Sequence, residues 1–148
     1  MKKETQEAPS AKGTWKLSIP GYREDQTTCQ IYNFYTNGDV VFIEAGEPEG
    51  GRALLRIRMR FPANIANKMY FYGEDGTPAP PLLSVLRGST SMSYISKSRE
   101  GHITFEDFNY ANGTLRAKAN FSFIDHEHPE KKVYQAIMEV DAEGMIEK

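Results

Sequence analysis

The clearest pattern in the chain is a period-two alternation of apolar and polar residues over Gly101–Ile124. Ile103 and Phe105 alternate with polar residues, and the same alternation continues to Phe123 after an interruption at Asn112–Gly113. Successive side chains of a strand point to opposite faces of a sheet, so the pattern predicts two strands with one apolar and one polar face each. Asn and Gly favour tight turns, and the two strands are therefore expected to form a hairpin.

The charges on the polar face agree with this hairpin. Antiparallel pairing sets Glu106 and Thr104 roughly opposite Arg116 and Lys118. Opposite charges on neighbouring strands stabilise their pairing. The charge pattern and the apolar pattern thus favour the same register, and we expect the rest of the sheet to be organised around this hairpin.

Shorter runs of alternating apolar and polar residues, bounded by turn residues, recur along the chain. A second hairpin is predicted where Asn37–Gly38–Asp39 separates Cys29–Thr36 from Val40–Ala45. Both faces of these two strands are largely apolar, so we expect this hairpin to be central and covered on both sides. Further strands are predicted at Gly13–Ile19, Arg52–Phe61, Lys68–Tyr72, Leu82–Arg87, Ser91–Lys97 and Lys132–Val140. Ser98–Gly101 is expected to be a tight connection.

These segments predict a single all-β domain. About eight to nine short antiparallel strands, with turns roughly every eight to twelve residues, are typical of a β-sandwich or a β-barrel. Asn64–Lys68 is the one helix candidate and is a single turn long. The 148 residues fit one domain over 13–148, with Trp15 in its core, after a flexible tether at 1–12 whose composition is that of an unfolded segment.

The amino-acid composition restricts the class of partner that the protein is expected to bind. Eighteen basic against twenty acidic residues give a net charge of −2, whereas a general nucleic-acid binder needs a basic field to displace counterions from phosphate. We therefore expect a protein partner or a small ligand and no nucleic acid. No bilayer-spanning apolar run occurs. One hypothesis is that the tether is what remains when the leader of an exported or lipid-anchored bacterial protein is removed, which would place the domain in the periplasm or at the cell surface, with the cytoplasm as the alternative compartment. An ordinary frayed amino terminus is the alternative.

The inventory of catalytic groups predicts no enzyme and no cofactor. The single cysteine, Cys29, excludes an intrachain disulfide and begins an apolar strand, so an inert buried thiol is expected. Glu106 and Asp107 alternate faces, which argues against their use as an acid–base pair on one surface. Gly-x-Ser-x-Gly, Walker, Rossmann and His-Glu-x-x-His motifs do not occur in the sequence.

Three arginines are the first candidate binding residues. Arg56, Arg58 and Arg60 alternate with apolar residues, which spaces their charges about 7 Å apart on one strand face. One interpretation is a solvated face paired with Glu44 or with other acids of the next strand. The other is a docking stripe for an acidic partner or an anionic ligand, because guanidinium groups match carboxylates and phosphates.

Two further candidates are aromatic and imidazole groups. Tyr70 and Tyr72, beside the proline-rich loop Gly73–Pro81, are candidates for a partner-binding rim, with Phe71 expected in the core. His126 and His128 are the candidate metal ligands, in a turn where Asp125 adds a carboxylate. A zinc site would need further ligands, and His102 is the only other histidine, so no metal is predicted.

Two short stretches resemble known families. Gly13–Thr14–Trp15 is similar to the Gly-x-Trp motif of calycins, the lipocalin and fatty-acid-binding barrels, in which the tryptophan closes the barrel base. Gly101-x-Ile103-x-Phe105, followed by Asn112–Gly113–Thr114–Leu115 and Phe121-x-Phe123, resembles the closing hairpin of small β-domains in exported bacterial lipoproteins. Neither resemblance supplies a catalytic residue.

The sequence therefore favours a non-enzymatic binding or interaction domain. The first alternative is a calycin-like barrel that carries a small hydrophobic ligand. The second is an inhibitor or immunity protein that blocks a toxin or protease through Gly73–Pro81 or Asp125–Lys131. The oligomeric state is not indicated by the sequence.

Overall fold

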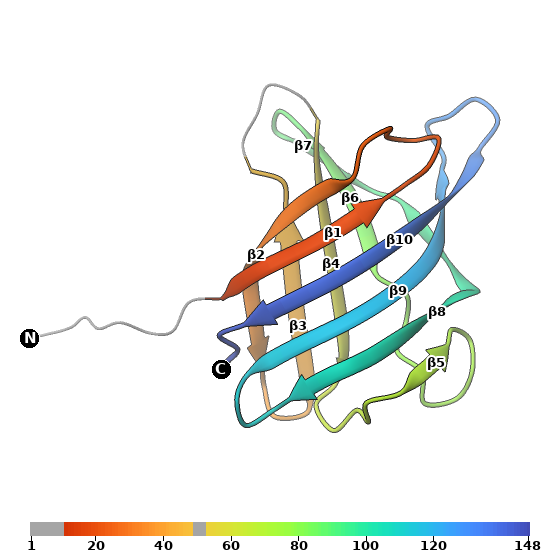
Figure 1. The fold of residues 1–148 in the computed structure, drawn as a ribbon. Coiled ribbons are helices and arrows are strands. Elements are labelled where there is room, and N and C mark those ends of the chain that lie inside the picture. Colours follow the sequence, from red (N-terminus) through yellow and green to blue (C-terminus); the bar gives the residue numbers. More distant parts are fainter. Residues whose placement is uncertain (1–10, 49–52) are drawn as a thin grey trace, which may run out of the picture.

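The fold is all-β (Figure 1). A computed structural model of the protein describes residues 11–48 and 53–148, which contain eleven strands and no helix. The all-β prediction is confirmed. Because these residues form no helix, no helical segment among them has the length and apolar character needed to cross a membrane. The strands are β1 Lys12–Ser18, β2 Thr27–Thr36, β3 Val40–Gly46, β4 Leu54–Pro62, β5 Met69–Phe71, β6 Leu82–Arg87, β7 Thr90–Ser93, β8 Ile95–Asn109, β9 Thr114–Asp125, β10 Lys132–Glu143 and β11 Ile146–Glu147.

The strands belong to one sheet that folds over on itself. Its order is β5-β8-β9-β10-β1-β2-β3-β4-β6-β7, antiparallel throughout, and β11 adds to β2 in parallel. In Figure 1, β1, β8, β9 and β10 lie in front of β3, β4 and β6, with β2 joining the two layers. The sheet does not close into a barrel, so the arrangement is that of a β-sandwich-like single domain.

The predicted hairpin of Gly101–Ile124 is present as β8 and β9. Thr104 pairs with Lys118, as expected. Glu106 does not pair with Arg116, because the register shifts between Phe105 and Asp107 and Asp107 becomes the partner of Arg116. Such a bulge adds one residue to one strand, and it interrupts the face alternation that the sequence predicted there.

The connection predicted at Ser98–Gly101 is instead an irregular part of β8. The register shifts between Ser96 and Gly101, and the strand continues through the shift. Gly101 has a φ of +102°, and a Cβ at this position would collide with the backbone oxygen of Asn120. A glycine can follow this close approach where a larger residue would be strained.

The second predicted hairpin is also present, as β2 and β3. A bulge between Ile31 and Asn33 changes the parity of β2, so Phe34 is buried while Tyr32 is 50% exposed. The prediction that this hairpin is covered on both sides is wrong, because the outward side chains of Tyr35 and Phe42 are only partly covered. An aromatic outer face remains open to solvent.

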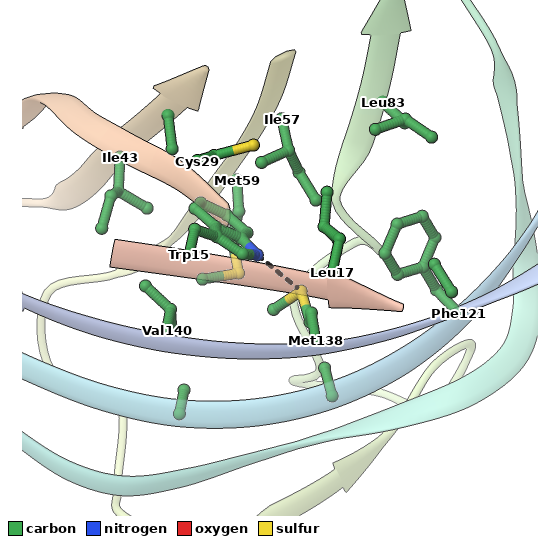
Figure 2. Close-up of a cluster of buried hydrophobic side chains, with 14 of the residues drawn as sticks. Trp15, Leu17, Cys29, Ile43, Ile57, Met59, Leu83, Phe121, Met138 and Val140 are labelled. Atoms are coloured by element: carbon green, nitrogen blue, oxygen red, sulfur yellow. Dashed lines mark hydrogen bonds between the residues drawn. The ribbon is translucent and has the colours of Figure 1, made fainter. Parts of the chain in front are cut away.

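The space between the two layers is filled by apolar side chains. Figure 2 shows Trp15 among residues of β1, β2, β3, β4 and β10, and the indole is fully buried. Phe61 of β4 and Phe105 of β8 come from opposite layers, and their ring centroids lie 4.9 Å apart. This interdigitation is how two sheet faces form one core.

Two smaller predictions concern the ends and connections. Most of the predicted tether lies outside the described residues, and Lys12, which was assigned to it, is the first residue of β1. Asn64–Lys68 contains turns and bends in place of the single helical turn considered from the sequence.

Candidate anion-binding surface

Three arginines line the outer face of β4. In this strand Leu55, Ile57, Met59 and Phe61 are buried, whereas the intervening arginines are exposed. The alternation in the sequence is thus used as predicted, with the apolar side chains in the core and the guanidinium groups in solvent. We call the outer face formed by these arginines and the neighbouring rings the arginine–aromatic surface. It consists of Arg56, Arg58 and Arg60 of β4, Tyr32 and Tyr35 of β2, and Phe42 of β3.

The register sets one acidic residue against this stripe. Glu44 lies directly across from Arg58, whereas Phe42 is the partner of Arg60 and Gly46 that of Arg56. The Glu44 carboxylate accepts a hydrogen bond of 2.9 Å from Nδ2 of Asn33. Within 11–48 and 53–148, none of the three guanidinium groups forms an ion pair. Glu44 is therefore where the first interpretation placed it, but it does not pair with an arginine.

The rings beside the arginines are stacked and capped by cations. Tyr35 and Phe42 stack with centroids 4.9 Å apart, and the Lys148 ammonium lies 4.2 Å from the Tyr35 centroid. The Arg56 guanidinium carbon lies 5.9 Å from the centroid of Tyr32. Burial and the neighbouring Glu44 raise the pKa of the Tyr32 phenol, while Arg56 and the next arginine along β4 act in the opposite direction.

A groove of about 530 Å³ opens in the part of this surface that contains Arg58 and Arg60. It is lined by Tyr35, Phe42, Ile43, Glu44, Arg58, Met59, Arg60, Ala79, Pro80 and Leu82. Pairing of β6 with β4 ends at Leu82 opposite Arg58, so Ala79 and Pro80 stand beside the end of β4 as the far wall. Nothing in the sequence connects this loop with the arginines; its prolines fix an extended backbone and its glycines permit bends, which indicates only a non-strand segment.

The two tyrosines predicted near this loop do not join the surface. Tyr72 is 4% exposed and its hydroxyl has no hydrogen-bond partner among the described residues. Tyr70 is half-buried, and its hydroxyl bonds to the backbone of Ala66. Phe71 is 52% exposed beside His102, so the predicted core position of Phe71 and the predicted rim position of Tyr72 are wrong.

The turn that contains His126 and His128 does not bring a set of metal ligands together. His128 Nδ1 accepts a hydrogen bond from the backbone of Glu130, and the His126 ring packs against Tyr94. His102 is on β8, paired with β5 and β9. In the described ranges, no three His, Cys, Asp or Glu side chains are grouped so that they could hold a metal ion.

The remaining candidates for chemistry are a thiol and two carboxylates. Cys29 is fully buried, and burial raises the pKa of its thiol to about 12. Such a thiol is a poor nucleophile, as expected for a structural cysteine. Glu106 and Asp107 are both exposed, so the prediction that they alternate faces is wrong at the bulge of β8. Glu106 lies 3.7 Å from the Lys118 ammonium.

No protein-family model matches the chain, and the searches of curated proteins and of solved structures found no significant match.

Proposed function

We propose that the protein is a non-enzymatic binding module that holds an anionic partner on the arginine–aromatic surface. The supporting observation is that Arg56, Arg58 and Arg60 form no ion pair within the described part of the chain while two of them line a groove. Guanidinium groups in this state keep their donors available for a carboxylate or phosphate.

The opposite layer contains a neutralised cation in the same sheet. Arg116 and Lys118 of β9 have the same two-residue spacing as Arg58 and Arg60. The Lys118 ammonium, however, lies 3.7 Å from Glu106 and 3.8 Å from a second carboxylate on β10. The outer face of β9 therefore satisfies a cation internally, whereas β4 does not.

A bound anion would offset the electrostatic repulsion between the arginines. Two unit charges about 7 Å apart repel by roughly 0.6 kcal/mol in bulk water and roughly 2.4 kcal/mol at the effective dielectric of a protein surface. Salt screens part of this, since the Debye length at physiological ionic strength is about 8 Å. A partner with carboxylates or phosphates would convert the repulsion into attraction.

The groove composition supports binding more than chemistry. Its lining in the described residues supplies aromatic rings, two arginines and the carboxylate of Glu44, without a cysteine, histidine or serine. The interior of the sandwich, which a carried hydrophobic ligand would need, is filled by packed rings such as Phe61 and Phe105. An inhibitor or immunity protein would be one form of such a module, with Gly73–Pro81 forming part of the contact through Ala79 and Pro80. Export or lipid anchoring remains part of this proposal.

Fluorescence anisotropy with fluorescein-labelled poly-L-glutamate tests the proposed function. We expect saturable binding by the wild-type protein that weakens as sodium chloride is raised. Arg58→Gln/Arg60→Gln should bind about tenfold more weakly, a difference of roughly 1.4 kcal/mol. The matched control is Arg116→Gln/Lys118→Gln, which removes the same charge at the same spacing from β9 and should leave binding unchanged. Equal affinities for both double variants, or no binding by the wild type, would contradict the proposal.

A further inference from the structure

We propose that the occupant of the arginine–aromatic surface is an extended peptide segment with acidic side chains at every second position, lying along β4. This inference rests on the proposed function, because it names the partner class of the same surface. It follows from three features of the surface: the spacing of the cations, the state of the aromatic rings and the shape of the groove.

The spacing of the cations matches an extended chain. Arg56, Arg58 and Arg60 alternate along one strand, so neighbouring members are two strand residues apart. Two residues of extended chain advance about 6.8 Å. A peptide in the same conformation that runs along β4 repeats its own side chains at this distance, so acids at alternate positions meet successive guanidinium groups. Five such residues are enough to reach all three arginines.

The state of the rings disfavours a single-stranded nucleic acid as the partner. Base recognition of that kind needs free aromatic faces for stacking. Tyr35 is stacked on Phe42, and the Lys148 ammonium lies 4.2 Å from its ring centroid. Arg56 lies over Tyr32. Bases would have to displace these contacts, whereas carboxylates need only reach the guanidinium groups.

The groove also offers apolar side chains against which the acidic side chains of the peptide can pack. Phe42, Pro80 and Leu82 line it together with Arg58 and Arg60. The methylene stems of glutamate can pack on these apolar side chains while the carboxylate meets a guanidinium, as long charged side chains commonly do. Glu44 lies in the same groove directly across from Arg58, so its carboxylate opposes an incoming acid there, whereas Arg56 and Arg60 face Gly46 and Phe42 and have no such opposition.

The test uses two labelled decapeptides of the same composition, made of glutamate and serine. One has its four glutamates at positions 2, 4, 6 and 8, and the other has them at positions 1, 4, 7 and 10, which in an extended chain points successive acids to opposite sides. A labelled deoxythymidine decamer is the third probe. Anisotropy titrations measure all three against the wild type, Arg58→Gln, and the control Arg116→Gln on β9. Circular dichroism and thermal unfolding verify that each variant is folded.

We expect the alternate-position peptide to bind about tenfold more tightly than the every-third peptide, and we expect this preference to disappear in Arg58→Gln and persist in Arg116→Gln. If both peptides bind equally and both weaken in Arg58→Gln, the inference is wrong while the proposed function stands. Tighter binding of the deoxythymidine decamer than of either peptide overturns the partner class. If neither the peptides nor poly-L-glutamate bind to the wild type, the proposed function fails and the inference fails with it.

Discussion

The indole N–H of Trp15 donates a hydrogen bond to the sulfur of Met138, at an Nε1–Sδ distance of 3.2 Å. Both side chains are buried, and Figure 2 shows the bond in the middle of the apolar cluster. A buried indole N–H without an acceptor loses its hydrogen bond to water and gains nothing in return. The thioether thus supplies the one polar contact that lets the tryptophan lie in the core.

Met138→Leu should be more destabilising than its volume change suggests. It keeps the apolar bulk but removes the acceptor, so we expect the free energy of unfolding to fall by about 1–3 kcal/mol. Met59→Leu is the matched control, because Met59 is also buried and accepts no bond from the indole. That swap should cost less than about 1.5 kcal/mol. Urea unfolding followed by the fluorescence of the single tryptophan measures both, and a larger loss for Met59→Leu would contradict the role given to the sulfur.

Gly101→Ala should be far more damaging than Gly38→Ala, although both glycines have nearly the same φ angle. Their φ angles are +102° and +99°. A Cβ at Gly38 meets open space, whereas one at Gly101 collides with the backbone oxygen of Asn120. Conformational strain of about 1–2 kcal/mol is common to both, and the collision adds a further loss of roughly 1–3 kcal/mol at Gly101. Thermal unfolding compares the two variants, and similar midpoints would show that β8 moves to accommodate the methyl group.

The buried thiol of Cys29 should make the fold less stable at alkaline pH. Burial raises its pKa from the ordinary value of 9.0 to about 12 in the folded state. Between these values the unfolded chain binds fewer protons than the folded one, so the free energy of unfolding falls as pH rises, by up to about 1.4 kcal/mol per pH unit. Cys29→Ser removes this titration, and the slope of its stability between pH 9 and 11, measured by urea unfolding, should be shallower than that of the wild type. Parallel slopes would be inconsistent with a protonated buried thiol.

Removing one hydroxyl should have opposite effects at two buried tyrosines. Tyr72 has no hydrogen-bond partner for its hydroxyl among the described residues, whereas the hydroxyls of Tyr94 and Tyr22 lie 2.6 Å apart. We expect Tyr72→Phe to be neutral or to stabilise by up to about 1 kcal/mol and Tyr94→Phe to destabilise by about 1 kcal/mol. Urea unfolding of both variants decides this. A clear destabilisation by Tyr72→Phe would mean that its hydroxyl is bonded to a bound water.

The elements that were best predicted from the sequence are the strands with one solvent-exposed face and one buried face. Along β9 and β4, solvent on one side forces strict alternation, and the alternation identifies both the strand and its outward residues. This is why the exposure of Arg56, Arg58 and Arg60 could be predicted. It also explains why Phe71 was expected inside and Tyr72 outside, the reverse of what is found. Their segment is apolar on both faces, so no polar residue indicates which side chains point into the core.

The parts that were missed depend on bulges and on distant neighbours. An extra residue between Ile31 and Asn33 moves Tyr32 to the outer face, and such an insertion has no distinctive composition. The groove arises because Ala79 and Pro80 lie beside the end of β4, which comes some twenty residues earlier in the chain. A local residue pattern cannot indicate contacts between segments that are this far apart in the sequence. The surface could therefore be predicted as a row of charges but not as a hollow.

The position of β1 bears on how the protein is made. This strand lies between β2 and β10, and Trp15 pairs with both Cys29 and Val140. A ribosome releases the tryptophan long before β10 exists, so the emerging chain must keep a large ring without its final neighbours for most of synthesis. Nascent chains that stop short of β10 would thus present an open sheet edge along β1, which is the state that chaperones recognise and that aggregates form from.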